Sequence, residues 1–323
     1  MSADLGSGPL AGYALAGVAL VLFAASILLT RLATARVALS TGFVVSLAVN
    51  VLVAALLFAV ELAVRRGPLV FDAGGVLAFA LAGVLTTYLG RWFFYGCVER
   101  LGPAKASTFH ISSPLVTAVL GAAFLGERLP AAAIAAMVAT SIGLYLVATS
   151  RRSVPPSVVA ADGIGVAAPA GLSSRVDAWL RSGVALGVGA SASYAVGNLL
   201  RGLGIARWDE AIAGALLGAL AALALQLAVQ RGRGRTFAAL RTADRRGVAL
   251  YATIGCTTIV AQVLTIAAMA HAPVAIVALI TLCTPLLVFP ASFLLLGNEE
   301  GITARAVLGA ALALAGIAAI VLR

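Results

Sequence analysis

One arginine and two tyrosines share a face of an otherwise apolar stretch in the first third of the chain. Tyr88, Arg91 and Tyr95 are spaced i, i+3 and i+7, which places them on one side of a helix. A polar side chain deep in an apolar helix is costly and usually faces a cavity or a partner helix. Arginine is permanently charged, and its planar fork of N–H donors suits a carboxylate or a phosphate. These residues predict a ligand site anchored by Arg91; the alternatives are an arginine that snorkels to the membrane surface or an internal ion pair with Glu99 or Glu61.

A second polar stripe repeats this spacing in the second half of the chain. Its members fall at i, i+3, i+7 and i+10, and they are Ser191, Tyr194, Asn198 and Arg201. Four polar residues on one helix face do not suit lipid, so we expect the stripe to face water or another helix. Tyr194 and Asn198 are the ligand-contacting candidates of this stripe.

Three more candidates lie singly in other apolar stretches. His110 is the residue best placed to titrate near neutral pH, although a neutral imidazole bonded to a neighbouring helix is the plainer interpretation. Gln262 occupies the position of Arg91, and Thr281 that of His110, when the two halves of the chain are aligned on a shared motif. We therefore add His110, Gln262 and Thr281 to the predicted site.

That shared motif is Ser/Thr-Pro-Leu, at residues 113–115 and again at 284–286. In both copies a glycine follows the proline by 12 residues, and a long apolar run comes next. We expect Pro114 and Pro285 to bend their helices and free backbone carbonyls for other partners. Duplicated sets of membrane helices are typical of solute carriers, because alternating access needs two similar units around a central site.

The composition favours a membrane protein built only from helices. Hydrophobic residues make up 62% of the chain and charged residues 11%, and the mean hydropathy is +1.08. Lipid offers no partner for unpaired backbone groups, so spanning segments of this kind are helical. We predict ten of them, at 10–30, 38–62, 75–98, 104–125, 131–149, 182–201, 209–229, 247–269, 273–296 and 304–322. The three cysteines form no CxxC pair, and we expect neither a metal nor a cofactor.

The net charge of +10 reflects topology rather than nucleic-acid binding. The arginines lie in short connections between apolar segments and form no continuous basic domain. Most of them follow the first, third, fifth, seventh and ninth segments. The positive-inside rule then places those connections in the cytoplasm and both termini outside.

A polar connection divides the chain into two halves. Residues 150–181 contain Pro155-Pro156 with several Ser, Gly and Ala residues, which is typical of a flexible linker. We predict a first five-helix repeat at 1–149 and a second at 182–323. An odd number of helices in each half makes the second repeat inverted in the membrane.

The chain resembles the drug/metabolite transporter superfamily, and within it the ten-helix EamA-type permeases. The resemblance rests on the order of short motifs in both halves, namely 101–107, 113–115, 125–129 and 143–147, then 272–275, 284–286, 297–299 and 315–317. It implies an inverted bundle of five plus five helices, with the fifth and tenth segments at the periphery and available for a homodimer contact. In two respects the chain departs from the family: Asn298 stands where the first half has Glu127, and the family is usually drawn with cytoplasmic termini.

No Asp or Glu lies in the middle of any predicted segment, and this shapes the expected substrate. A proton-coupled exporter of cations generally needs a buried carboxylate, whereas this chain offers Arg and His. We expect a secondary transporter of the cytoplasmic membrane that exports a small neutral, zwitterionic or anionic metabolite, such as an amino acid. The candidate coupling ion is a proton.

Two alternatives remain at this level. A carrier of lipid-linked or sugar-conjugate cargo would suit the aromatic cluster at 92–95. An intramembrane protease would need a serine and a histidine in contact, for which Ser191 and His271 are the superficial candidates.

Overall fold

Every secondary-structure element in the computed structural model is a helix, within the residues that it describes: 9–101, 103–149, 183–229, 240–284, 286–288, 291 and 304–321. The helices are α1 (Pro9–Thr34), α2 (Leu39–Val64), α3 (Ala73–Gly83), η1 (Val84–Leu89), α4 (Gly90–Leu101), α5 (Pro103–Phe124), α6 (Ala131–Thr149), α8 (Gly183–Arg207), α9 (Ala211–Val229), α11 (Arg245–Met269), α12 (Val274–Leu282) and α14 (Ala304–Val321). The prediction of an all-helical membrane protein is confirmed.

Each of the ten predicted segments contains helix, but not all of these helices are equally suited to crossing a membrane. Six stretches are long and apolar enough to span, and they begin at Pro9, Thr41, Ala73, Gly183, Ala211 and Arg245. The apolar parts of α5, α6, α12 and α14 are shorter. Ten crossings and an inverted repeat therefore remain predictions, and the predicted linker at 150–181 lies outside the described residues.

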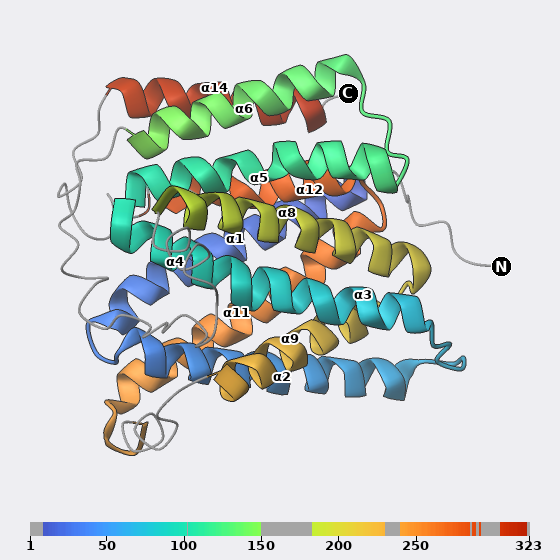
Figure 1. Cartoon of the computed structure of the whole chain (residues 1–323). Coiled ribbons are helices and arrows are strands. Elements are labelled where there is room, and N and C mark those ends of the chain that lie inside the picture. The colour runs from blue at the N-terminus through green and yellow to red at the C-terminus, as the bar shows by residue number, and fades with distance from the viewer. Residues whose placement is uncertain are drawn as a thin grey trace, which may run out of the picture.

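The two halves of the chain interlock in one bundle (Figure 1). The most extensive helix contacts join α1 to α11, α6 to α14, α4 to α8 and α2 to α11, and each pair takes one helix from each half. In Figure 1 the helices lie side by side across the page, with α6 and α14 at the upper edge and α2 at the lower. Neither half has a core of its own, so the interior is a seam between the halves.

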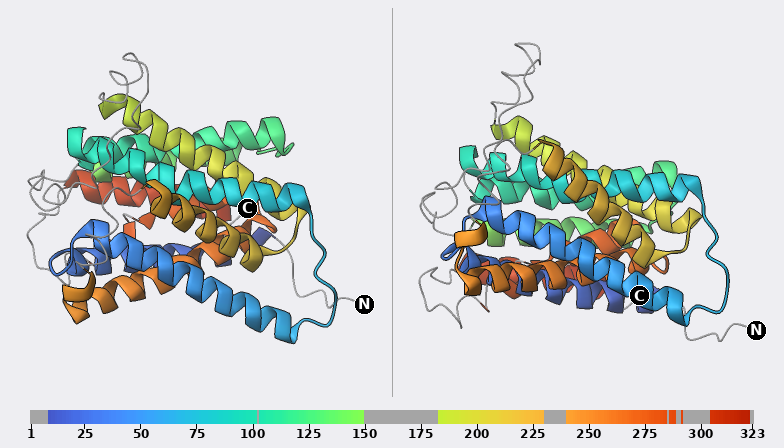
Figure 2. Two further views of the ribbon diagram at one scale, coloured as in Figure 1. Left: turned by 60° about the horizontal axis from the view of Figure 1, so that its bottom comes forward. Right: turned by 90° about the horizontal axis from the view of Figure 1, so that it is seen from below.

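The bundle has two ends, each formed by connections between the helices. The Arg65 end is formed by the connections 65–72, 125–130, 208–210 and 270–273, and it lies on the right in Figure 1. The Arg36 end is the opposite one, formed by residues 35–38 and the start of α11. Figure 2 shows from two more directions that the connection between α2 and α3 closes one end of the bundle.

Glycines allow the closest helix approaches. A Cβ atom on Gly83 of α3 would lie 2.2 Å from the Cα atom of Gly218 in α9. In the peripheral pair, a Cβ atom on Gly143 of α6 would lie 2.5 Å from the carbonyl oxygen of Gly309 in α14. Small residues let membrane helices pack backbone to backbone, since no side chain separates them. Among the described helices α14 packs mainly on α6, which confirms the peripheral position expected for this pair.

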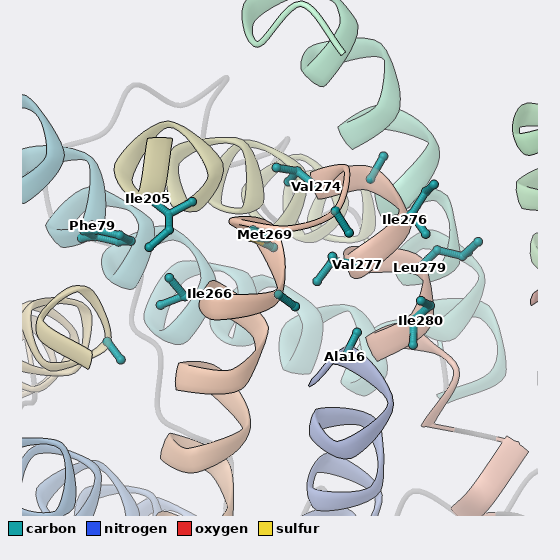
Figure 3. Packing of buried hydrophobic residues seen from close by; sticks show 14 of the residues in the cluster. Ala16, Phe79, Ile205, Ile266, Met269, Val274, Ile276, Val277, Leu279 and Ile280 are labelled. Atoms are coloured by element: carbon teal, nitrogen blue, oxygen red, sulfur yellow. The ribbon is translucent and has the colours of Figure 1, made fainter. Parts of the chain in front are cut away.

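The centre of the bundle is an apolar cluster around α12 (Figure 3). Every residue from Val274 to Ile280 is buried, so protein rather than lipid surrounds this helix on all sides. Phe79 of α3, Ile205 of α8 and Ile266 of α11 belong to the same cluster. This core fixes three of the helices that build the polar site described next.

The third predicted segment contains a π-helical turn between α3 and α4. In η1 the amide of Gly90 donates to the carbonyl of Leu85, one residue further back than in an α-helix. A π-turn rotates the following helix and often marks a functional site. Here it turns two buried threonines, Thr86 and Thr87, toward the second half of the chain.

Candidate functional site

The most buried cation among the described residues is Arg201 of α8. Only 8% of the surface of this residue is exposed. Its Nη2 group donates to Oγ1 of Thr86 at 2.9 Å and to Oε1 of Gln262 at 3.0 Å. Thr87 also donates to Oε1 of Gln262, at 3.4 Å. Helices α8 and α11 of the second half thus meet η1 of the first half in one polar network.

A small cavity adjoins this network. Its volume is about 10 Å³, which is room for roughly one water molecule, and it is lined by Phe79, Gly83, Arg201, Gly214, Ala215, Gly218, Gln262 and Ile266. One wall is polar, while the others are apolar or bare glycine backbone. Ligand pockets usually measure 300–1,000 Å³. The cavity is therefore tight, with room for a small group beside the guanidinium.

No described carboxylate balances the charge of Arg201. The described acids, which are Glu61, Asp72, Glu127, Asp209, Glu210 and Asp244, all lie in connections or near helix ends. The three described ion pairs involve Arg36 and Arg65 only. Charge in a low-dielectric interior is costly unless it is paired. Among the described side chains, therefore, none compensates the positive charge of this site.

Arg91, the predicted anchor, lies close enough to Arg201 for the two charges to repel each other. Its guanidinium carbon lies 5.5 Å from the ring centre of Phe43 in α2, a cation–π contact. It makes no ion pair with Glu61, which binds Arg65 instead. Tyr88 packs beside it against Phe43 and α9. The internal ion pair with Glu61 considered for Arg91 is thus not formed, and the side chain of Glu99, the other partner considered, lies outside the described part of the structure.

His110 and Tyr194 meet where α5 and α8 cross. Their rings are 4.4 Å apart, edge to face, and Phe94 of α4 packs on the other side of the imidazole at 5.4 Å. The Nδ1 atom of His110 is buried and has no hydrogen-bond partner among the described residues. One turn away, the hydroxyls of Ser112 and Ser191 lie 2.9 Å apart. Tyr194 also lies near Gly90, so this group adjoins Arg91.

The predicted stripe on α8 is therefore an interhelical one. Ser191 contacts α5, Tyr194 contacts α5, and Arg201 contacts η1 and α11. Asn198 lies between Tyr194 and Arg201 on this helix and is half-buried. The stripe provides a continuous polar edge along the seam.

The remaining predicted site residues are less informative. The hydroxyl of Thr281 bonds back to the Val277 carbonyl within α12, at 2.9 Å. Pro114 lies inside a continuous α5. Tyr95 belongs to α4, but its side chain lies outside the described part of the structure, as does Pro285. The predictions for these last two residues thus stay untested.

The aromatic cluster that suggested lipid-linked cargo is a packing element. Trp92, Phe93, Phe94 and Phe109 surround the buried residues Cys97 and Leu186. The serine and histidine considered for a protease are also apart: Ser191 bonds to Ser112, and His271 lies in the exposed turn after α11.

The Arg65 end of the seam is closed by charged and aromatic contacts between the halves. Arg65 donates to both carboxylate oxygens of Glu210, at 2.6 Å for the Nη1–Oε1 contact, and to Glu61 at 2.8 Å. The bonds to Glu210 and Glu61 raise the pKa of the Arg65 guanidinium further, so it stays charged. Trp208 donates to the Val70 carbonyl at 2.6 Å and stacks on Phe71.

Glu127 ties the halves together at the same end. Gly126 has a positive φ of 66°, and the Glu127 amide donates to the Gly121 carbonyl, which folds the carboxylate back over the end of α5. There Oε1 accepts the Val274 amide at 2.7 Å, capping α12 where Pro273 offers no side-chain cap. Burial raises the pKa of the Glu127 carboxyl, and the bond from the Val274 amide acts the other way.

The Arg36 end has one exposed bridge between the halves. Arg36 donates to Asp244 at 3.2 Å, and Asp244 also caps the start of α11. The bond from Arg36 lowers the pKa of Asp244, so the bridge is intact at neutral pH and is lost only as pH falls through that lowered value. Both ends of the seam are thus spanned by contacts between the two halves.

Comparison with known proteins identifies the first half. Residues 10–149 match the model of the EamA-like transporter family. Residues 10–149 belong to the EamA-like transporter family. A search of curated proteins finds no match. A solved structure titled "Crystal structure of protein" superposes with a TM-score of 0.66 and 16% identity, and it covers 96% of each chain. At that identity it supports the fold alone, but over nearly the whole chain.

The family match over residues 10–149 and the six described apolar helices of spanning length support a multi-pass membrane transporter of the drug/metabolite type. Sequence reasoning had placed Arg201 on the correct stripe without recognising it as the centre of the site. It gave no sign of Thr86 and Thr87, because a π-turn changes their direction and leaves no clear mark in a short apolar sequence. The alignment that matched Gln262 with Arg91 did point to one partner of Arg201.

Proposed function

We propose that this protein is a secondary transporter of the cytoplasmic membrane that exports a small zwitterionic or anionic metabolite, such as an amino acid, by alternating access. The observation that carries the proposal is the polar network of Arg201, Thr86 and Gln262 at the seam. A site shared by two halves can be exposed to either side when they rock against each other. Neutral metabolites, which the sequence also allows, are less suited to it because Arg201 lacks a counter-charge.

Contacts at both ends of the seam support the same mechanism. Arg65–Glu210 bridges the halves at one end and Arg36–Asp244 at the other. A carrier must open one end while the other stays closed, and each of these pairs joins the two halves at one end of the bundle. The Arg36–Asp244 pair is exposed and therefore weak, whereas Glu210 is buried in its pair with Arg65. A proton is the coupling ion proposed, although no described carboxylate lies within a helix midsection.

The test is transport in proteoliposomes that contain the purified protein. Uptake and counterflow are measured with radiolabelled amino acids and small organic anions, for the wild type, Arg91→Ala and the control Arg66→Ala. Arg66 is exposed in the connection after α2, so the control removes the same charge at a surface position outside the Arg201 network. We expect saturable flux of one substrate that is lost in Arg91→Ala and kept in Arg66→Ala. Absence of flux in folded wild-type protein across the panel would contradict the proposal.

A further inference from the structure

The hydrogen bonds of Arg201 leave most of its donors unused. A guanidinium has five N–H groups in a rigid fork. Nη2 donates both hydrogen bonds described for Arg201. The two acceptors, the Thr86 hydroxyl and the Gln262 amide oxygen, are neutral. The cavity lies directly against this side chain and against Gln262. Its remaining N–H groups are therefore available to a molecule in the cavity.

The charge of this site calls for an anion. Arg201 is buried, Arg91 adds a second positive charge nearby, and no described carboxylate pairs with either. An unpaired cation in a membrane interior is costly, and such residues mark functional sites by default. A bound anion would remove that cost. Thr86, Thr87 and Gln262 are neutral and cannot.

The shape of the cavity restricts the anion. Its walls opposite Arg201 are Phe79 and Ile266 and the bare backbones of Gly83, Gly214 and Gly218. Arginine and a carboxylate form two parallel N–H···O bonds in one plane, which fits a flat group pressed between helices. The cavity volume of about 10 Å³ is far below that of a usual ligand pocket, so only the head of a small anion fits beside Arg201 and the rest of the molecule must lie outside the cavity.

We propose that the cavity beside Arg201 is the subsite for the carboxylate of the transported metabolite. Arg201 binds the two carboxylate oxygens, and Gln262 and Thr86 hold the guanidinium in place from the two halves of the chain. The inference rests on the proposed transport function for its biological meaning. The binding itself can be measured without transport. A small inorganic anion such as chloride has the same charge and is the competing occupant.

The first test measures ligand-induced thermal stabilisation of the purified protein in chloride-free detergent solution. The probes are sodium acetate, sodium lactate and L-alanine, each compared with its amide, and sodium chloride and sodium nitrate form a separate arm. A ligand that binds only the folded protein raises its melting temperature in proportion to the logarithm of its concentration over Kd. We expect at least one carboxylate to stabilise the wild type and its amide not to. Equal stabilisation by chloride or nitrate, or by the amides, would overturn the carboxylate assignment.

The decisive variant is Gln262→Glu. It keeps an oxygen acceptor for Arg201 and nearly the same shape, so a purely structural role of Arg201 predicts an unchanged or stabilised protein. If Arg201 binds the carboxylate of a ligand, the side chain of the new glutamate pairs with Arg201 and competes with that ligand. We then expect the affinity for the ligand to fall at least about tenfold, because one charge-assisted contact is lost. Unchanged affinity in this variant would refute the proposal.

Arg201→Gln completes the set, with Arg66→Gln as the matched surface control. Carboxylate binding should vanish in the first variant and persist in the second. The outcomes separate the two claims. Carboxylate binding without flux would contradict the transport function and leave the subsite standing, whereas carboxylate flux that survives Arg201→Gln would refute the subsite and leave transport standing.

Discussion

At the scale of single residues, this protein has ionisable side chains at buried positions, where membrane helices usually have apolar ones. Arg201 and Glu127 are both partly or wholly removed from water, yet each has a neutral partner rather than an opposite charge. Burying a charge that has only neutral hydrogen-bond partners costs more free energy than burying one in an ion pair. Retained cost of this kind is expected at functional positions, where stability is sacrificed for activity.

Arg201→Met should therefore give a protein that is at least as stable as the wild type. The variant removes an uncompensated charge, Thr86 still donates to the Ala82 carbonyl, and Gln262 still accepts from Thr87. Replacing buried charged groups by apolar ones of similar size is neutral or stabilises by about 1–4 kcal/mol. Thermal unfolding in detergent measures the effect. Arg65→Met is the contrast, because it strands Glu61 and Glu210, and a lower melting temperature for Arg201→Met than for Arg65→Met would contradict the interpretation.

Glu127 predicts a pH dependence of stability with a definite sign. Its pKa is raised in the folded protein, so the folded state holds the proton more tightly than the unfolded state. The contribution of Glu127 is then most favourable below its ordinary value of 4.5 and is lost as pH rises through the raised value. Glu127→Gln keeps an acceptor for the Val274 amide and cannot ionise.

We expect the melting temperature of Glu127→Gln to equal that of the wild type near pH 4 and to exceed it at neutral pH. Other titrating groups contribute to both proteins and cancel in the difference. The exposed Asp209→Asn serves as the control for removing an acid at the same end of the bundle. Parallel profiles of the wild type and Glu127→Gln between pH 4 and 8 would show that burial of the carboxyl is unimportant.

At the scale of helices, the site depends on close packing that glycine permits. Gly83 and Gly218 bring α3 and α9 together directly beside the cavity, and η1 begins at the next residue, Val84. If α3 moved away, Thr86 and Thr87 would leave Arg201 and Gln262. The close approach thus positions the polar network as well as the fold.

Gly83→Ala should destabilise the protein by about 1–3 kcal/mol, the usual cost of overpacking a tight contact. Its new Cβ would lie 2.2 Å from backbone in α9, which cannot give way as a flexible side chain would. Gly17→Ala is the matched control, because Gly17 lies within α1 and its Cβ would meet nothing within 4 Å. There we expect no loss, or a gain of up to about 1 kcal/mol from the better helix former. Equal unfolding temperatures for the two variants would contradict the described α3–α9 contact.

The sequence predicted the helices well because lipid imposes a simple rule on them. Long apolar runs such as 38–62 and 247–269 can only be helices in a membrane, and α2 and α11 lie there. The contacts across the seam were harder to predict. Arg91 looked like the anchor because it is the deepest cation in its segment, but the position of Arg201 relative to Gln262 depends on how α8 and α11 pack, which periodicity does not encode. Glu127 caps a helix of the other half, a contact between distant segments that no local pattern encodes.

At the scale of the whole molecule, the contacts described at the two ends of the seam differ in strength. The Arg65 end combines a two-oxygen arginine–carboxylate contact, the Glu61 pair and the Trp208–Phe71 stack, whereas the Arg36 end has one exposed pair among the described contacts. Bidentate arginine pairs are stronger and more rigid than single ones. We infer that the structure represents the conformation closed at the Arg65 end.

Loosening that end should expose the cavity to water from the same side. Glu210→Gln removes the charge that Arg65 holds across the seam and leaves the fold of α9 intact. A cysteine at Ala215, a buried residue of the cavity wall, reports access when the native Cys97, Cys256 and Cys283 are replaced by alanine. In right-side-out and inside-out vesicles, a membrane-impermeant thiol reagent should label this cysteine several-fold faster in Glu210→Gln, and from one side only.

The neighbouring acid provides the control for this experiment. Asp209 is exposed and forms no ion pair among the described residues, so Asp209→Asn changes the surface charge equally without touching the Arg65 contact. The vesicle type that gives faster labelling also identifies the side on which the Arg65 end lies. The arginine distribution predicts the outer side, since Arg36 and the basic connections are at the other end. Faster labelling from the cytoplasmic side would reverse that topology, and equal labelling of Glu210→Gln and Asp209→Asn would show that the Arg65–Glu210 pair does not close the site.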